Sequence, residues 1–246
     1  MRKIVALILA MTSLCALSKP IRSSLGADGT SSSKSDVLYD AEVQYLESTG
    51  TQFIDTGFYA VAGLGCEITV AVPSGYGTWI NYGILGWNND WQGGGALTRT
   101  FAIVAWVSGT PVSINFAVGD GRVAVSSISI PNVYGNMMVV SYNAHENTFS
   151  VDGSSIQNPN TLTYTDETRP VNTMPLFGIM GNNSFAGSSV RIREAKFFYN
   201  GQIVKDLVAV RFTNDNNEQE GAMLDRETGV LYRNAGTDNF IIGPDL

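Results

Sequence analysis

The feature that most constrains this chain is a two-residue alternation of apolar side chains, which is broken up by turn residues. Apolar residues recur at period two or in short β-branched and aromatic runs, as in residues 101–107, 112–118 and 137–142. A period of two places successive side chains on opposite faces of a strand, whereas the periodicity of helices is nearly absent. The pattern therefore predicts an all-β fold.

Two dipeptides mark the tight turns between strands. Asp152 and Gly153 end an alternating run, and Asn200 and Gly201 separate two more. Asp-Gly and Asn-Gly tolerate the positive φ angles of hairpin turns, so the strands that they join run antiparallel. Many antiparallel strands with one apolar face must pack sheet on sheet. We expect a two-sheet antiparallel sandwich.

The first eighteen residues have the pattern of a secretory signal peptide. Two basic residues follow Met1, an apolar run occupies residues 4–11, and the small residues Ala16 and Ser18 suit cleavage after Ser18. No later apolar stretch approaches the roughly 18 residues that a membrane span needs. We expect a protein that is secreted, periplasmic or at the cell surface, without membrane insertion after cleavage.

The remainder divides into a tether and one domain. Residues 19–41 are rich in serine and poor in apolar side chains, as in a flexible tether. Residues 42–246 have no internal linker, which fits a single large sandwich. Signal cleavage would leave Cys66 as the sole cysteine, so no disulfide forms within the chain, and we predict a small buried apolar role for it.

The charge balance argues against one class of partner. The chain has 22 acidic and 15 basic side chains. An acidic protein repels phosphate backbones and anionic lipid surfaces. Nucleic acid is therefore excluded as an expected partner.

Three segments resemble a known family. Residues 43–57, 197–207 and 221–237 are similar to the opening, penultimate and closing strands of laminin-G-like domains in bacterial and phage surface proteins. These domains belong to the concanavalin A-like lectin and glucanase superfamily. The resemblance implies a jelly roll whose first and last segments pair. It leaves activity open, because this fold occurs in lectins, glycosidases and structural modules.

The chain lacks the alternating acidic strand of the superfamily's glucanases. The spacing of Asp225 and Glu227 is suitable, but we expect them in a hairpin turn, and Glu218 and Glu220 in an exposed polar loop. The single histidine, His145, is predicted at a hairpin tip, where solvent competes with any fixed partner. No catalytic residue is assigned, and we expect that the protein is not an enzyme.

One segment has the residues of a sugar site. Trp87, Asn88, Asn89, Asp90 and Trp91 combine two indoles with amide and acid side chains in a glycine-rich stretch. Aromatic rings stack on sugar faces, while the polar side chains bond to hydroxyls. We therefore predict these five residues as the ligand-binding loop.

A different interpretation of the same segment stays open. Trp87 then closes the strand that precedes it, and Trp91 folds back over the sandwich edge. Trp79, Tyr82 and Trp106 lie in alternating apolar runs, and we expect all three in the core.

Calcium is left open as a ligand, because Asx-rich segments occur at residues 215–217 and 182–183. Such segments are more often plain turns, so no metal ligand and no other cofactor is assigned. The expected function is an exported, non-catalytic module that recognises glycan, or a surface protein, at loops on one sandwich edge. The alternatives are a structural or adhesive surface component and, with less support, a glycoside-active enzyme.

Overall fold

The computed structural model describes residues 39–73, 80–88, 99–107, 112–120, 124–131, 134–163, 165, 170, 172–181 and 184–246. In these ranges the chain forms β-strands and no helix, as the alternation predicts. Consequently no helix in the described ranges is long and apolar enough to cross a membrane. The strands form two sheets, and the sheets make an antiparallel β-sandwich.

The large sheet contains eleven strands within the described residues, in the order β11-β10-β9-β4-β15-β16-β17-β18, with β1, β2 and β19 beside this path. Its strands are β1 (Ala41–Glu42), β2 (Leu46–Glu47), β4 (Leu64–Ala71), β9 (Met138–Asn143), β10 (Thr148–Val151), β11 (Ser154–Gln157), β15 (Arg191–Tyr199), β16 (Gln202–Thr213), β17 (Gln219–Asp225), β18 (Leu231–Arg233) and β19 (Ile241–Ile242). All of their pairings are antiparallel.

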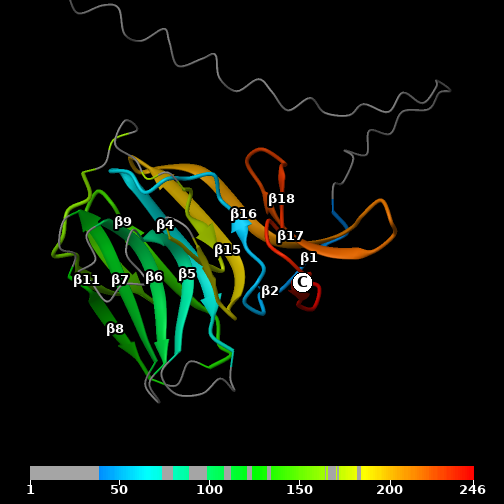
Figure 1. Ribbon diagram of the computed structural model, residues 1–246, viewed down its shortest axis with the longest axis horizontal. Helices are drawn as coiled ribbons and strands as arrows, with labels where there is room; N and C mark the ends of the chain where they lie inside the picture. Colours follow the sequence, from blue (N-terminus) through cyan, green and yellow to red (C-terminus); the bar gives the residue numbers. More distant parts are fainter. Residues whose placement is uncertain are drawn as a thin grey trace, which may run out of the picture. The chain divides into compact units, whose positions relative to one another are not determined.

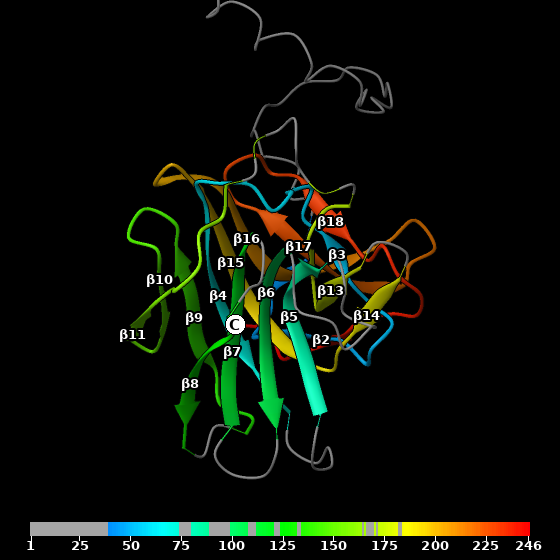
Figure 2. The ribbon, with the colours of Figure 1, turned by 60° about the vertical axis from the view of Figure 1, so that its left-hand side comes forward.

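The small sheet has the order β14-β13-β5-β6-β7-β8, with β12 and β3 beside it. Its strands are β3 (Ile54–Asp55), β5 (Ile80–Asn88), β6 (Arg99–Val107), β7 (Val112–Asp120), β8 (Ser126–Ile130), β12 (Pro175–Leu176), β13 (Gly178–Met180) and β14 (Phe185–Gly187). One pairing, between β13 and β5, is parallel. Figure 2 shows β5, β6 and β7 in front of β4, β15 and β16 of the large sheet.

Aromatic side chains join the two sheets in the core. The ring of Phe116 in β7 stacks on that of Phe149 in β10, with centroids 4.5 Å apart. Phe101 in β6 meets Tyr142 in β9 edge to face at 5.5 Å. All four side chains are buried in one apolar cluster that draws on both sheets. Since burial of apolar area is the main driving force for such packing, this cluster holds the sandwich together.

The prediction that Trp79, Tyr82 and Trp106 lie in the core is confirmed for Tyr82 and wrong for Trp106. Tyr82 is buried, but Trp106 is 36% exposed, and Trp79 lies outside the described residues. The flanking residues Ala105 and Val107 face the core, so Trp106 faces the outer side of the small sheet. A run that is apolar at every position hides the alternation, because both of its faces look suitable for burial.

The two predicted hairpin turns are confirmed. Asp152 and Gly153 have φ angles of 46° and 82°, and they join β10 to β11. Asn200 and Gly201 have φ angles of 50° and 80°, and they join β15 to β16. Both residues of each turn are therefore in the left-handed region that these dipeptides tolerate.

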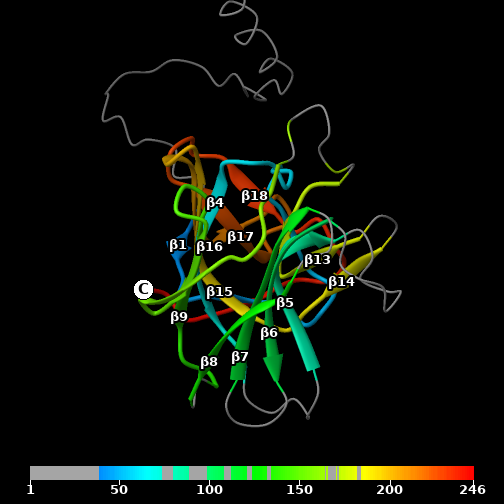
Figure 3. The same ribbon diagram turned by 90° about the vertical axis from the view of Figure 1, so that its left-hand side faces the viewer.

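The first and last described segments pair with each other, as the resemblance implied. Val43 forms an antiparallel bridge with Asp245, and β2 pairs with β19. Figures 1 and 3 show the C-terminus beside β1. Pairing of β1 with β16 includes Ala41, and the Asp40 N–H donates to the Arg211 carbonyl at 2.8 Å, while the predicted domain boundaries stay a prediction.

The opening motif contains buried polar side chains that are satisfied by hydrogen bonds. Ser48, Gln52 and Thr56 are fully buried. The Ser48 hydroxyl donates to the Gln52 carbonyl at 3.1 Å, and the Thr56 hydroxyl donates to the Met174 carbonyl at 2.6 Å. Buried polar groups must be hydrogen-bonded, so Ser48 and Gln52 stabilise the turn before β3, and Thr56 joins the end of β3 to the segment before β12, rather than presenting groups to a ligand.

Candidate functional site

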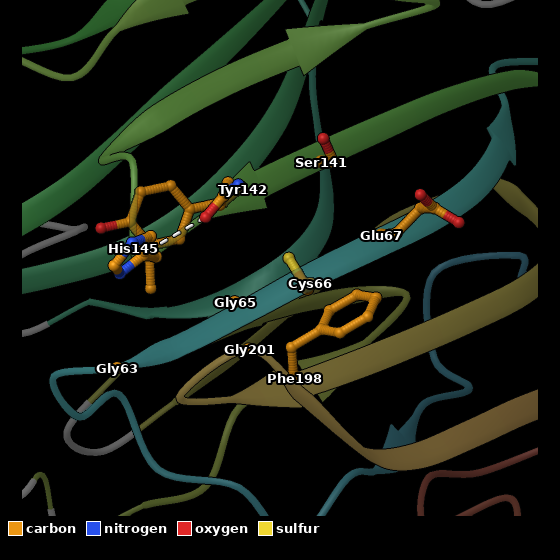
Figure 4. Close-up of a pocket in the computed structure, with 11 residues that line it drawn as sticks. Gly63, Gly65, Cys66, Glu67, Ser141, Tyr142, His145, Phe198 and Gly201 are labelled. Atoms are coloured by element: carbon orange, nitrogen blue, oxygen red, sulfur yellow. Dashed lines mark hydrogen bonds between the residues drawn. The ribbon is translucent and has the colours of Figure 1, made fainter.

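A surface pocket of about 300 Å³ lies where β4 begins, between the turn after β9 and the turn after β15. Figure 4 shows Phe198 on one side of β4 and His145 on the other. Glu67 and Phe198 alternate along their strands with the buried residues Cys66 and Phe197. The pocket therefore lies on the outer face of the large sheet, away from the core.

The strand register brings the lining residues together. Phe198 in β15 is the cross-strand partner of Gly65 in β4, and Glu67 is the partner of Ser141 in β9. Side chains that are paired across strands on one face lie about 4.5–5.5 Å apart at Cβ. Residues from three strands thus converge on one small area of the sheet.

Glycine at position 65 lets the backbone of the turn after β9 approach β4 closely. A Cβ atom there would lie 2.8 Å from the carbonyl oxygen of Tyr142, which is closer than van der Waals contact allows. Gly63 and Gly201 also line the pocket. Phe198, whose side chain is half-buried, borders the same pocket.

Polar groups line the rest of the pocket. The Glu67 side chain is 45% exposed, and its Oε1 atom lies 3.8 Å from Nζ of Lys196. The Ser141 hydroxyl is 2.7 Å from the hydroxyl of Ser150 in β10. A carboxylate accepts hydrogen bonds and a hydroxyl both donates and accepts. Together they offer partners for a ligand that is rich in hydroxyl groups.

The turn after β9 is held by its own first residue. The Asn143 side-chain oxygen accepts the backbone N–H groups of His145 at 3.0 Å and of Glu146 at 3.2 Å. Figure 4 marks the bond to His145 as a dashed line. Local capping of this kind fixes a turn. His145 is exposed there, as predicted, but it also lines the pocket, which its position in the sequence did not indicate.

The thiol beside the pocket is unreactive at neutral pH. Burial raises the pKa of Cys66 from 9.0 to about 12, and the side chain is 1% exposed. Burial also raises the pKa of the neighbouring Tyr142. A protonated thiol is a poor nucleophile, so Cys66 has the small buried apolar role that was predicted.

The acidic pairs considered as catalysts lie at the two ends of β17 (Gln219–Asp225) and in the turns beside it. Asp225 ends β17 and is buried, and its carboxylate accepts the Thr228 hydroxyl at 2.6 Å and the backbone N–H of Glu227 at 3.2 Å. This confirms the predicted hairpin. Glu220, which was expected in a loop, lies in β17, because the pairing with β16 continues as far as Gln219.

The predicted ligand loop is placed differently by the structure. Trp87 and Asn88 are the last residues of β5, where they pair with Phe101 and Thr100 of β6, so their expected position in a loop is wrong. Trp87 is 4% exposed and Asn88 is 0% exposed. The pairing of β5 with β6 continues to the last residue of β5, which the composition of the segment did not indicate.

Asn89, Asp90 and Trp91 lie outside the described residues. The alternative in which Trp87 closes the preceding strand fits its position at the end of β5. Ligand binding by the five residues together stays a prediction. The structure presents neither Trp87 nor Asn88 at the surface, because both are buried.

The Asx-rich segment at residues 215–217 is a turn between β16 and β17. The Asn214 side-chain oxygen accepts the backbone N–H groups of Asn216 and Glu218, both at 2.9 Å. Residues 182–183 lie outside the described ranges. Within those ranges, no group of three or more His, Cys, Asp or Glu side chains is arranged to hold a metal ion.

Comparison with known proteins identifies no family for this chain. No family model and no curated protein matches the chain. Among solved structures, the chain is similar to the carbohydrate-binding module, CBM40, of the Ruminococcus gnavus IT-sialidase, which was solved bound to α2,3-sialyllactose. The TM-score is 0.38 at 13% sequence identity, and the match covers 63% of this chain and 90% of that chain. The laminin-G-like family stays a prediction.

Proposed function

We propose that this protein is a non-catalytic binding module that recognises a saccharide unit in the pocket at the start of β4. The observation that supports this most is the placement of an aromatic ring, Phe198, in one pocket with the Glu67 carboxylate and the Ser141 hydroxyl. A sugar has apolar C–H faces and a hydroxyl rim, so it needs both kinds of contact.

The size and rigidity of the pocket support the same proposal. Small-molecule sites usually measure about 300–1,000 Å³, and this pocket is at the lower end of that range at about 300 Å³. Glu67, Ser141 and Phe198 lie on paired strands above a packed core. Groups on rigid elements lose little conformational entropy when a ligand binds.

A non-catalytic role is consistent with the groups in the pocket. Glycosidases act with two carboxylates that flank the scissile bond. Glu67 is the one carboxylate among the described residues that line the pocket. A glycoside-active enzyme would therefore need a second carboxylate from elsewhere.

Export is part of the proposal. The basic start, the apolar run over residues 4–11 and the small residues at 16 and 18 support a signal peptide. The destination would then be secreted, periplasmic or at the cell surface. N-terminal sequencing of the protein produced in a bacterial host is expected to begin at Lys19, and an intact Met1 terminus on exported protein would contradict a cleaved signal peptide.

A glycan-array screen of the full-length chain tests the binding function. Phe198→Ala is expected to lose the signal of the parent, because it removes the aromatic side of the pocket. Tyr199→Ala is the matched control, since Tyr199 is an exposed aromatic residue of the same hairpin that does not line the pocket. Thermal unfolding of each variant shows whether it is folded.

The possible results separate the candidate functions. Loss of binding in folded Phe198→Ala but not in Tyr199→Ala supports the β4 pocket as the site. Equal binding by all three proteins would place the glycan elsewhere, with the segment at residues 87–91 as the next candidate. An empty array for the parent protein would argue against glycan recognition.

A structural or adhesive role has one observation in its favour. Tyr199, Ile203 and Val204 of the β15–β16 hairpin are 44%, 49% and 40% exposed. Exposed apolar side chains that lie together mark contact surfaces for other proteins. An empty array, together with surface adhesion that an Ile203→Ser/Val204→Ser variant loses, would favour this second function.

A further inference from the structure

The pocket carries one permanent charge among its described lining residues, and that charge is negative. The Glu67 side chain is 45% exposed, and its nearest cation is Nζ of Lys196 at 3.8 Å. This separation exceeds hydrogen-bond length. No described residue donates a hydrogen bond to the Glu67 carboxylate, so its oxygen atoms retain their full capacity to accept hydrogen bonds from a ligand.

Lys196 and two further cations also lie near carboxylates. Lys196 has Asp206 as its partner across the strands, in addition to Glu67. Arg226 lies 3.7 Å from Glu194 and 4.0 Å from Asp206. Arg193 lies 3.8 Å from Glu194. Each of these cations has a carboxylate within 4.0 Å, and the chain as a whole has a net charge of −7.

A carboxylate in this position makes the binding affinity depend on the charge of the ligand. It accepts hydrogen bonds from the hydroxyl groups of a sugar, but it repels a carboxylate or sulfate group that is held at the same distance. The repulsion between two unit charges about 4 Å apart in water corresponds to roughly a fivefold change in affinity.

We infer that the pocket takes uncharged saccharides and discriminates against acidic ones, such as uronic acids, with Glu67 as the residue that sets this specificity. The inference rests on the proposed saccharide site. Phe198 and Ser141 would bind the parts that neutral and acidic sugars share. Glu67 would face the group that differs between them, which is a hydroxyl in the neutral sugar and a carboxylate in the acidic one.

Matched pairs of sugars test the inference with the full-length chain. The probes are methyl glucoside with methyl glucuronide, and methyl galactoside with methyl galacturonide, titrated at low ionic strength and followed by ligand-observed NMR. We expect the neutral member of a bound pair to bind at least roughly fivefold more tightly than the acidic one. Glu67→Gln, which keeps the shape of the side chain, is expected to reduce this ratio to about twofold or less.

Asp215→Asn is the control. It removes one negative charge from an exposed side chain in the β16–β17 turn, and it is expected to leave the ratio unchanged. Acidic sugars that bind the parent as tightly as neutral ones would overturn the inference while leaving the saccharide site intact. An unchanged ratio in Glu67→Gln would remove Glu67 from the specificity. A parent that binds none of the four probes and no other glycoside would overturn the inference together with the proposed function.

Discussion

The Nζ atom of Lys205 lies 4.1 Å from the centre of the Tyr232 ring, and this contact ties β16 to β18. The same ammonium group lies 4.8 Å from the centre of the Phe58 ring and donates a hydrogen bond to the Thr56 carbonyl at 2.6 Å. Lys205 is buried, so these groups take the place of water around its charge.

Replacing this lysine is expected to destabilise the fold. Lys205→Met keeps most of the volume but removes the charged hydrogen bond and both ring contacts. We expect the free energy of unfolding to fall by about 2–3 kcal/mol, measured from urea unfolding. Lys196→Met is the matched control, because Lys196 is 31% exposed and lies 3.8 Å from its carboxylate partner. It should change stability by at most about 0.5 kcal/mol. Equal losses of unfolding free energy in Lys205→Met and Lys196→Met would show that the contacts of Lys205 with the two rings add nothing to stability.

The turn at Gly50 and Thr51 is packed between two other glycines. A Cβ atom on Gly187 would overlap the Gly50 carbonyl oxygen, and one on Gly236 would overlap the Thr51 carbonyl oxygen. Gly236→Ala is therefore expected to lower the free energy of unfolding by about 2–3 kcal/mol, because the backbone must move apart.

Gly229→Ala provides the comparison for that measurement. Gly229 has a φ of +70° with nothing near its Cβ position, so alanine there meets backbone strain alone. The expected loss is about 1 kcal/mol. Urea unfolding followed by tryptophan fluorescence measures both variants. A Gly236→Ala protein as stable as Gly229→Ala would contradict the close backbone contact.

Cys66 is expected to make stability depend on pH in the alkaline range. Burial raises the pKa of its thiol from 9.0 to about 12, so between these values the unfolded chain loses a proton that the folded chain keeps. The unfolded state then binds fewer protons, and stability falls as the pH rises. The slope from this group is about 1.4 kcal/mol per pH unit.

The comparison of the parent with Cys66→Ala isolates this group. Free energies of unfolding from urea titrations between pH 8 and pH 11 should converge as the pH rises, because the parent alone loses the contribution of the thiol. Tyrosine ionisation affects both proteins and largely cancels in the difference. Parallel curves would show that Cys66 has an ordinary pKa in the folded state.

The sequence predicted the strands well because strand formation and tight turns depend on neighbouring residues. The runs at 101–107 and 112–118 became β6 and β7, and the Asp-Gly and Asn-Gly turns have the expected positive φ angles. It predicted the candidate site poorly. Composition singled out the segment from Trp87 to Trp91, yet its first two residues are buried.

The pocket residues gave one usable signal. Alternation along β4 already places Glu67 opposite the apolar residues Cys66 and Ile68, whereas Phe198 lies between two other aromatic residues and has no such signal. Nothing near either residue in the sequence indicates that they lie close together. Phe198 is 133 positions from its partner Gly65, and Ser141 is 74 positions from its partner Glu67.

What the sequence by itself determined is the all-β class, the tight turns and the alternation that separates inner from outer residues, because all of these follow from local backbone preference. The tertiary structure decided which strands are neighbours. It turned Trp106 outward, buried Trp87, and brought Gly65, Ser141 and Phe198 together around one pocket. The physical reason is that strand order and register depend on how the two apolar faces pack as a whole, and a shift of one residue would move every side chain to the opposite face.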